Sequence, residues 1–261
     1  MSILDFIIAD KQIEVAQKKK IFPIPYLEAS PLFDRQSNSL VECLIKSASG
    51  IIAEHKRRSP SKQNINSSLS VAEVASSYEK AGACGMSVLT DGKYFGGSLD
   101  DLNLARSVTS FPILRKEFII DEYQIIEAKA HGADVVLLIA GVLSREQIKQ
   151  LSTKAKELEL EVLLEIHNLQ ELEKSIMPSL DIIGVNNRNL NTFRVSLATS
   201  KNLIHKIPDE FIKISESGLN TEADLARMAN VGARCFLIGE ALMRQENLED
   251  ATRSILSNPI I

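Results

Sequence analysis

The chain has 261 residues, 44% of them apolar, which suits one large α/β domain or two small ones, and we expect a single domain. A formal net charge of −4 is that of an ordinary protein surface, and the basic clusters at 18–20 and 56–58 are too isolated to predict a nucleic-acid partner. The longest apolar run, at 135–143, is far shorter than the roughly 20 residues of a membrane helix, so we expect a cytoplasmic protein with no membrane partner.

The residue types that bind metals are scattered along the chain. The 3 cysteines lie far apart and outside any CxxC pair, and the 4 histidines show no HExxH spacing. Such spacings argue against a disulfide framework and against a zinc site. We therefore predict that the protein binds no metal.

Residues 1–49 resemble an extension rather than a domain. Apolar periodicity predicts helices at 3–20 and 37–48, with the segment 23–31 extended between them. A segment of this length could scarcely bury a core of its own. We interpret it as a helical extension of the domain that follows, within one domain over 1–261; a separate N-terminal domain is the weaker alternative.

From residue 50 onward, short runs rich in β-branched residues recur between amphipathic stretches, and we predict that these runs are strands. They are IIAE at 51, MSVLT at 86, PILRK at 112, DVVLLIA at 134, EVLLEI at 161, DIIGV at 181, FIKIS at 211 and CFLIG at 235.

The stretches between these runs predict helices, of which the clearest are 70–82, 121–132, 144–159 and 221–232. Each opens on a side chain that can cap the first turn, namely Ser70, Asp121, Ser144 and Thr221.

Three predicted joints from helix to strand carry one short pattern, AGACGM at 81, HGADVV at 131 and VGARCF at 231. Glycine suits the end of a helix because the position after the last turn usually needs a positive φ.

Eight regular strand and helix units indicate a closed (β/α)8 TIM barrel. An open doubly wound sheet is the alternative, and it is disfavoured because the chain has neither GxGxxG nor GxxxxGK[ST].

The first predicted strand ends in charge, in IIAEHKRRSP at 51–60. Because strand side chains alternate, Ile52, Glu54 and Lys56 share one face. In a barrel this face points inward, and the active site lies at the carboxyl ends of the strands. For this strand alone, a catalytic pair and a solvated surface ion pair are equally good interpretations.

Other strands end in the same way. Lys116 follows PILR, Glu165 closes EVLLE, Asn186 and Arg188 follow DIIGV, and Glu216 ends FIKIS. So many polar groups converging on one mouth would be unfavourable unless they bind a ligand, which favours a functional site.

Neighbouring charged residues have weaker functional signals. We expect Arg115 and Glu117 to alternate toward the helices as a structural pair. We also give His167 a structural role, because the sequence names no partner for it. We expect His55 to face the helical layer.

The last two strands are followed by glycine, in SESGL at 215–219 and IGEAL at 238–242. The loops after strands seven and eight of such barrels commonly bind phosphate through backbone N–H groups. Gly218 and Gly239, with Lys56 as a counter-charge, predict a phosphorylated small-molecule substrate.

Together these motifs are similar to those of the indole-3-glycerol-phosphate synthase family, and the resemblance covers nearly the whole chain. The segments that carry it are IIAEHKRRSPS at 51–61, SVLTDGKYFGGS at 87–98, PILRKEFIID at 112–121, LLEIHN at 163–168, IGVNNRNL at 183–190, ISESGL at 214–219 and LIGEALMR at 237–244.

The resemblance implies a carboxy-lyase of tryptophan biosynthesis that uses neither metal nor cofactor. It would convert 1-(2-carboxyphenylamino)-1-deoxyribulose 5-phosphate to indole-3-glycerol phosphate, CO2 and water. Lys116 would be the general acid of ring closure. Glu165, assisted by Glu54 and Lys56, would serve the dehydration, although the group that acts in each step stays open. Asn186 would orient Glu54 and the substrate hydroxyls.

The resemblance also implies contacts around the substrate. The resemblance implies that Ser217 is a further catalytic residue. It would line the same mouth as Arg188 and Glu216. Substrate binding would also involve Ser59 and three apolar side chains around the anthranilate ring, Phe95, Phe118 and Leu137. Glu240 stands beside Gly239 where several members of the family have serine, so we expect it to offer phosphate only its backbone N–H and to turn its side chain to solvent.

Two rival functions follow from the same residues. One is a Schiff-base aldolase with Lys116 as nucleophile beside Glu165. The other is a catalytically inactive barrel kept as a binding module, which the intact set of polar residues disfavours. We infer no obligatory protein partner.

Overall fold

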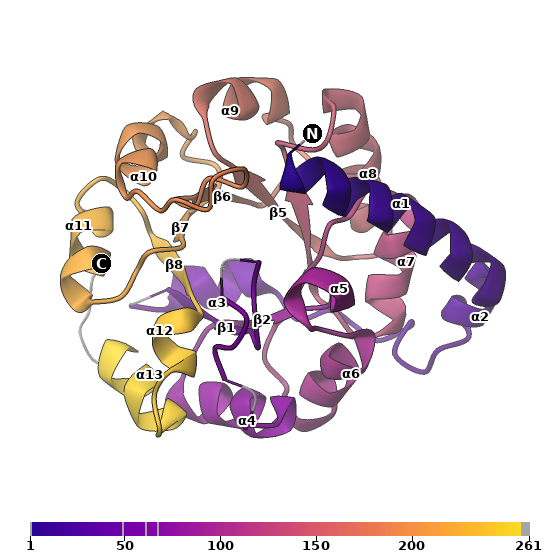
Figure 1. Cartoon of the computed structure of the whole chain (residues 1–261), viewed down its shortest axis with the longest axis horizontal. Coiled ribbons are helices and arrows are strands. Elements are labelled where there is room, and N and C mark those ends of the chain that lie inside the picture. The colour runs from indigo at the N-terminus through magenta and orange to yellow at the C-terminus, as the bar shows by residue number, and fades with distance from the viewer. Residues whose placement is uncertain (1, 49, 61, 67, 257–261) are drawn as a thin grey trace.

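The computed structural model describes residues 2–48, 50–60, 62–66 and 68–256, and in these residues eight parallel strands close into a barrel in chain order (Figure 1). Each strand starts within one residue of its predicted position, so the predicted TIM barrel is confirmed. The strands are β1 Ile51–His55, β2 Gly85–Leu89, β3 Ile113–Lys116, β4 Val135–Ile139, β5 Glu161–Ile166, β6 Ile182–Asn186, β7 Ile212–Glu216 and β8 Cys235–Ile238.

Helices surround the barrel (Figure 1), and all four predicted N-caps bond the first turn of their helix. The helices of the ring are α4 Val71–Ala81, α6 Leu99–Val108, α7 Glu122–Ala130, α8 Arg145–Glu157, α9 Leu169–Ser175, α10 Ala198–Leu203 with the 3-10 turn Ile204–Lys206, α11 Glu222–Ala229 and α13 Leu248–Leu256. Two short helices, α5 Gly92–Phe95 and α12 Glu240–Met243, directly follow β2 and β8.

The glycine pattern at the joints from helix to strand has the predicted cause. Gly82, Gly132 and Gly232 have φ values of +93°, +83° and +99°. Each allows the chain to leave a helix and enter the next strand within a few residues.

The N-terminal segment contains a helix that was not predicted. In place of an extended segment at 23–31, the structure has α2, Ile24–Glu28, between α1, Ile3–Ile21, and α3, Leu40–Lys46. Pro23 is the N-cap of α2 and Pro25 lies in its first turn. The extended prediction was wrong because proline suits the first turn of a helix, where its missing N–H and fixed φ cost nothing.

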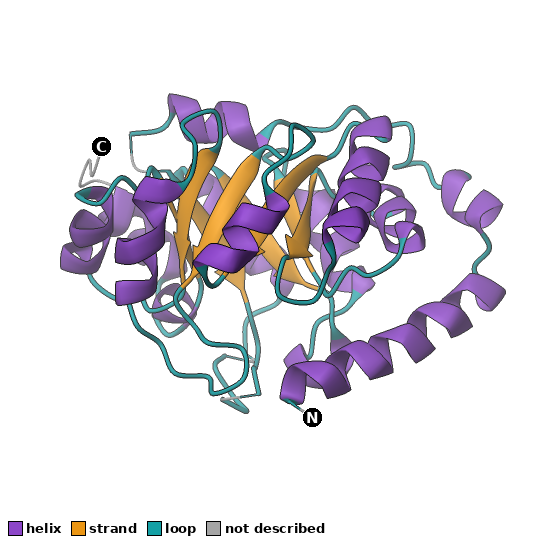
Figure 2. Ribbon diagram, turned by 90° about the horizontal axis from the view of Figure 1, so that it is seen from above, coloured by secondary structure: helices purple, strands orange, loops and turns teal. Residues whose placement is uncertain are grey.

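The helices α1 and α3 cover opposite ends of the barrel. At the amino ends of the strands, Glu161 of β5 accepts hydrogen bonds from the backbone N–H groups of Leu40 and Val41 at 2.8 and 3.0 Å, which fixes the start of α3. At the carboxyl ends, α1 lies over one side of the barrel and extends outward past α7 (Figure 1, Figure 2). Its buried Lys11 lies 3.0 Å from Asp91, which follows β2, and 3.1 Å from Glu117, which follows β3.

Two apolar layers confirm the predicted alternation of side chains. Ile52 belongs to the cluster that fills the barrel, while Ile51 and Ala53 pack in the layer between strands and helices. Glu54 and His55 continue this alternation at the end of β1. Among the described residues, no helix is long and apolar enough to cross a membrane.

Of the predicted pair, Arg115 meets the helical layer as expected, whereas Glu117 meets α1 and also lines the cavity at the carboxyl ends of the strands. Nη2 of Arg115 is 3.7 Å from Glu117 and 2.7 Å from Glu127 of α7. Burial by itself would raise the pKa of Glu117, but Lys11 and Arg115 hold it below its usual value. The pair therefore belongs to a buried ionic cluster that connects β3 with α1 and α7.

Candidate active site

A cavity of about 550 Å³ opens at the carboxyl ends of the strands. All the predicted site residues line it: Glu54, Lys56, Ser59, Phe95, Lys116, Phe118, Leu137, Glu165, Asn186, Arg188, Glu216, Ser217, Gly218, Gly239 and Glu240. The inward faces of the strands thus bring together residues that lie far apart in sequence.

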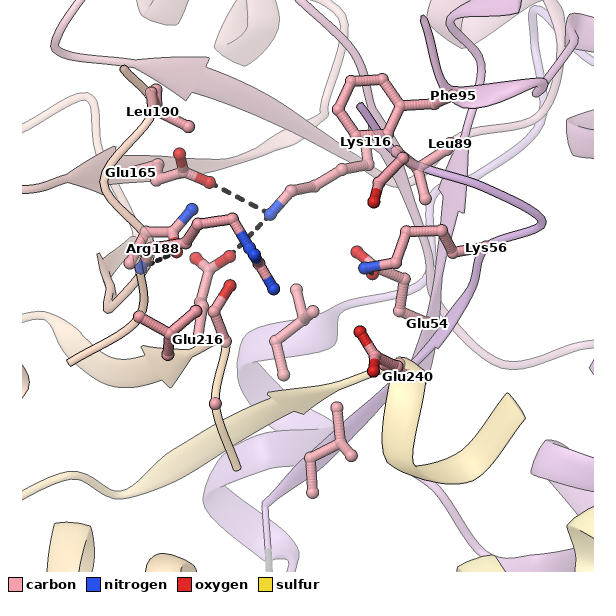
Figure 3. A pocket seen from close by; sticks show the side chains of 18 of the residues that line it. Glu54, Lys56, Leu89, Phe95, Lys116, Glu165, Arg188, Leu190, Glu216 and Glu240 are labelled. Carbon is pink, nitrogen blue, oxygen red and sulfur yellow. Dashed lines mark hydrogen bonds and ion pairs between the residues drawn. The ribbon is translucent and has the colours of Figure 1, made fainter. Parts of the chain in front are cut away.

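Lys116 occupies the centre of the polar side of this cavity. Its Nζ lies 2.6 Å from Oε2 of Glu216 and 3.1 Å from Oε2 of Glu165, so three strands meet at one ammonium group (Figure 3). Burial would lower the pKa of Lys116, but Glu216, Glu165 and the more distant Glu54 raise it above its ordinary value. Lys116 is therefore held as an ammonium.

The carboxylate of Glu216 fits because the neighbouring strand has no side chain at Gly184. A Cβ atom at Gly184 would lie 2.1 Å from Oε1 of Glu216. Oε1 is buried and has no hydrogen-bond partner among the described residues. Burial raises the pKa of Glu216 to about 7, and Glu165 adds to this effect while Lys116 opposes it. We did not predict Gly184 as a site residue, although a glycine inside a β-branched strand indicates a close approach.

Glu54 and Lys56 lie across the cavity from this cluster (Figure 3). Nζ of Lys56 is 2.7 Å from Oε1 of Glu54. Burial would raise the pKa of Glu54, but Lys56 and Lys116 lower it, so Glu54 is held as a carboxylate. A Cβ at Gly239 would lie 2.7 Å from Oε1 of Glu54, so this glycine makes room for Glu54.

Asn186 differs from expectation in its partner. Its side chain lies near Glu165, and its Oδ1 accepts the backbone N–H of Arg188 at 2.9 Å. The expected contact was with Glu54, which lies on the far side of the barrel mouth. Alternation predicted that Asn186 points inward. It could not predict which strand Asn186 faces, because that depends on the curvature of the closed sheet.

The loop after β7 is pinned in an unusual conformation. Ser217 and Gly218 have φ values of +65° and +77°. Nδ2 of Asn187 donates to the carbonyl oxygen of Ser217 at 3.1 Å. A left-handed serine costs free energy and persists only where neighbouring contacts fix it, a feature that is common at binding sites. Gly218 is also sterically required, because a Cβ there would lie 2.4 Å from Val195.

We had expected the side chain of Glu240 to turn to solvent, but it forms ion pairs instead. Its carboxylate pairs with Lys62 of the loop after β1, and Nη2 of Arg244 lies 2.9 Å from Oε1. Burial would raise the pKa of Glu240, but these two cations lower it. The charge beside the candidate phosphate site is thus compensated, and we had not predicted the participation of Lys62.

The apolar side of the cavity is formed around two aromatic rings. The centroids of Phe95 and Phe118 are 6.0 Å apart at an interplanar angle of 42°, and Leu137 lines the same cavity. Asp91 caps α5 by accepting the N–H of Tyr94 at 2.7 Å, which fixes the helix that carries Phe95. Because Asp91 also meets Lys11, α1 contributes to the position of this ring.

His167 has partners that the sequence did not name. It follows β5 and contacts Glu165 and Glu171. His55 is buried on the helical side of β1, as expected. Among the described residues, no cluster of three His, Cys, Asp or Glu side chains is placed to hold a metal ion.

Comparisons with known proteins identify the family of the chain. Residues 4–255 match the family model of indole-3-glycerol phosphate synthase. The indole-3-glycerol phosphate synthase of Bacteroides thetaiotaomicron is 46% identical over 93% of this chain and 93% of its own length, and that of Azospirillum brasilense is 40% identical over 98% and 99%. Among solved structures, thiamine phosphate pyrophosphorylase from Pyrococcus furiosus shares the fold, with a TM-score of 0.59 at 14% identity over 84% of this chain and 98% of that one.

The match extends over nearly the full length of both this chain and its relatives, and the charged mouth of the barrel is formed by the motifs that first indicated the same family. The chain belongs to the indole-3-glycerol phosphate synthase family, the carboxy-lyases that form the indole ring in tryptophan biosynthesis.

Proposed function

We propose that the cavity converts 1-(2-carboxyphenylamino)-1-deoxyribulose 5-phosphate to indole-3-glycerol phosphate, CO2 and water. One observation carries the proposal: Lys116 is held as an ammonium between Glu165 and Glu216, opposite Glu54, in a cavity with an aromatic wall. This arrangement offers a proton donor, carboxylate bases and an apolar surface within one substrate length.

Ring closure is the task of Lys116. The aromatic carbon that bears the carboxylate attacks the ribulose carbonyl carbon, and the carbonyl oxygen takes a proton from Nζ. The carboxylates that raise the pKa of Lys116 hold this proton in the free site. The developing alkoxide is a stronger base than either carboxylate, so transfer becomes favourable only as the new bond forms.

Decarboxylation needs no further group from the protein. The cyclised ring system is an electron acceptor, so the electron pair of the breaking C–CO2 bond restores the aromatic ring. No cofactor therefore enters the proposed mechanism.

Dehydration needs an acid for the departing hydroxyl and a base for the proton that is lost. We assign this step to Glu165, assisted by Glu54 and Lys56. The ion pairs of Glu165 with Lys116 and of Glu54 with Lys56 support the anionic form of each carboxylate. Asn186 lies near Glu165 and is assigned the role of orienting it, and Ser217 lines the same mouth.

Two ends of the substrate require different environments. We assign the anthranilate ring to Phe95, Phe118 and Leu137. The phosphate is assigned to the backbone N–H groups at Gly218, Gly239 and Glu240, with Lys56 as a counter-charge. Ser59, Arg188 and Glu216 complete the predicted substrate contacts, and all of these residues line the same cavity.

We also propose that residues 1–261 form one domain in which residues 1–49 are a helical extension. The contacts of Lys11 at the mouth and of Glu161 with α3 support this division. A cytoplasmic location and the absence of an obligatory protein partner belong to the same proposal.

The direct test is to incubate the pure protein with the ribulose phosphate, without added metal or cofactor, and to follow indole fluorescence. Product should accumulate with time and protein concentration. A chain that releases no indole product under these conditions would contradict the proposed reaction.

A further inference from the structure

The imidazole of His167 lies between two carboxylates. Nδ1 is 3.2 Å from Oε2 of Glu171, and Nε2 is 3.3 Å from Oε1 of Glu165. Nε2 is buried and makes no aligned hydrogen bond among the described residues, so its approach to Glu165 is the contact of an ion pair. His167 thus connects the candidate catalytic carboxylate with a residue outside the cavity lining.

Glu171 is held by the first turn of α9. Its Oε2 accepts the backbone N–H of His167 at 2.8 Å, and its Oε1 accepts Nδ2 of Asn168 at 2.7 Å. Asn168 in turn caps α9 by accepting the N–H of Glu171 at 2.9 Å. A Cβ at Gly141 would lie 3.4 Å from Oε1, so the loop after β4 passes near this carboxylate. Glu171 is therefore a fixed acceptor for the imidazole ring.

The position of the ring determines its charge. A neutral imidazole has one N–H and one lone pair, so one ring nitrogen would direct a lone pair at a carboxylate. Only the imidazolium has an N–H for both Glu165 and Glu171. Burial alone would lower the pKa of His167, but its bonds to these two carboxylates raise it to about 10.

Each oxygen of Glu165 consequently faces a different cation. Oε2 is 3.1 Å from Nζ of Lys116, and Oε1 is 3.3 Å from Nε2 of His167. Among the described residues, the amide of Asn186 on β6 and the carboxylates of Glu216 on β7 and Glu54 on β1 also act on this carboxylate. The imidazolium has been given neither a catalytic step nor a substrate contact.

We propose that His167 is a positioning residue for Glu165: anchored on Glu171, it holds one carboxylate oxygen so that the other stays directed at Lys116 and the substrate. The proposal rests on the assignment of dehydration to Glu165 above. It predicts that the pair His167 and Glu171 affects turnover rather than substrate binding, because neither side chain reaches the cavity.

The first test compares His167→Gln and Glu171→Gln with the wild type in the fluorescence assay across pH 5.5–9. We expect His167→Gln to lower kcat about 10–100-fold, as for the loss of a group that orients a catalytic residue, and to change KM less than about twofold. The acidic limb of its kcat profile should move to higher pH, because Glu165 loses a neighbouring cation. Glu171→Gln should cause a smaller fall in kcat, about 3–10-fold, and move the limb in the same direction.

His131→Gln is the matched control. His131 is similarly half-buried and has a side-chain partner, Asn103 at 3.0 Å, but it follows α7 at the opposite end of the barrel. It should keep the wild-type pH profile even if its melting temperature falls. If the variants at 167 and 171 lower stability alone and leave the profile unchanged, His167 is structural and the proposal is overturned.

The second test does not depend on activity. Two-dimensional 1H–15N NMR of the histidine rings in the wild type should show His167 doubly protonated from pH 6 to 8.5, and Glu171→Gln should bring its titration into this range. A ring that already titrates near pH 6.5 in the wild type overturns the proposal. If the wild type makes no indole product, the proposed function fails; if it does and both His167 tests are negative, only the positioning role fails.

Discussion

Gly184→Ala offers a sharp test of how the barrel holds Glu216. The new Cβ would lie 2.1 Å from Oε1 of Glu216, whereas ordinary contact begins at 3.4 Å, so the carboxylate must move by about 1.3 Å. Its hydrogen bond with Lys116 is 2.6 Å long and cannot survive such a shift. A charge-assisted bond of this kind contributes about 1.5–3 kcal/mol, and misplacement by about 1 Å commonly costs about 10²-fold in rate.

We therefore expect Gly184→Ala to lower kcat about 10²-fold while the protein still folds. The atom that must move is the end of a side chain, and alanine is favoured over glycine inside a strand by about 0.5–1 kcal/mol, so the free energy of unfolding should change by less than about 2 kcal/mol. Steady-state fluorescence kinetics and urea unfolding measure the two effects. Gly92→Ala is the control, because the nearest atom to its Cβ would be 3.5 Å away.

A double variant isolates the cause. If Gly184→Ala acts only by displacing Glu216, it should reduce activity by less than about twofold further in a Glu216→Ala background. Normal turnover in the single variant, or a full additional loss in the double variant, would refute the steric explanation.

The remaining predictions concern three other positions. Lys116→Met should lower kcat at least about 10²-fold, the usual scale for a positioned acid; near-normal turnover, or borohydride trapping of substrate on Lys116 of the wild type, would contradict the acid role. Glu240→Ala should lower KM about threefold and make KM more sensitive to salt, because Lys62 and Arg244 then face the phosphate alone; an unchanged or higher KM would argue against this phosphate site. Burial and nearby Arg57 lower the pKa of His55 to about 4. Below about pH 6.5 the unfolded chain therefore binds a proton that the native state does not, which should lower the free energy of unfolding by about 2 kcal/mol at pH 5. His55→Val should abolish this loss, as measured by urea unfolding at pH 7 and pH 5.

The ring of site residues was predictable because alternation within a strand depends only on local geometry. Glu54, Lys116 and Glu165 each end a run of apolar residues, and every one of them lines the cavity. The same argument identified the glycines at the ends of helices, since a positive φ is a property of one residue.

The pairing of these side chains was not predictable. Lys116 meets Glu165 and Glu216 from strands that are not its neighbours in the barrel, so the contact depends on the width of the closed sheet. The same dependence explains why Asn186 lies near Glu165 rather than Glu54. The helix α2 was missed for a local reason, since two prolines resemble an extended segment unless the N-terminal position of a helix is considered.

The buried Lys11 has a consequence for the order in which the chain can assemble during synthesis. Its partners Asp91 and Glu117 lie on segments that follow the second and third strands, so α1 cannot complete its contacts until residue 117 has been added. The bond between Leu40 and Glu161 spans 121 residues, which delays the docking of α3 still further. The helices α1 and α3 are thus translated before the segments that hold them, and they cannot dock on the ends of the nascent barrel until its middle strands have been made.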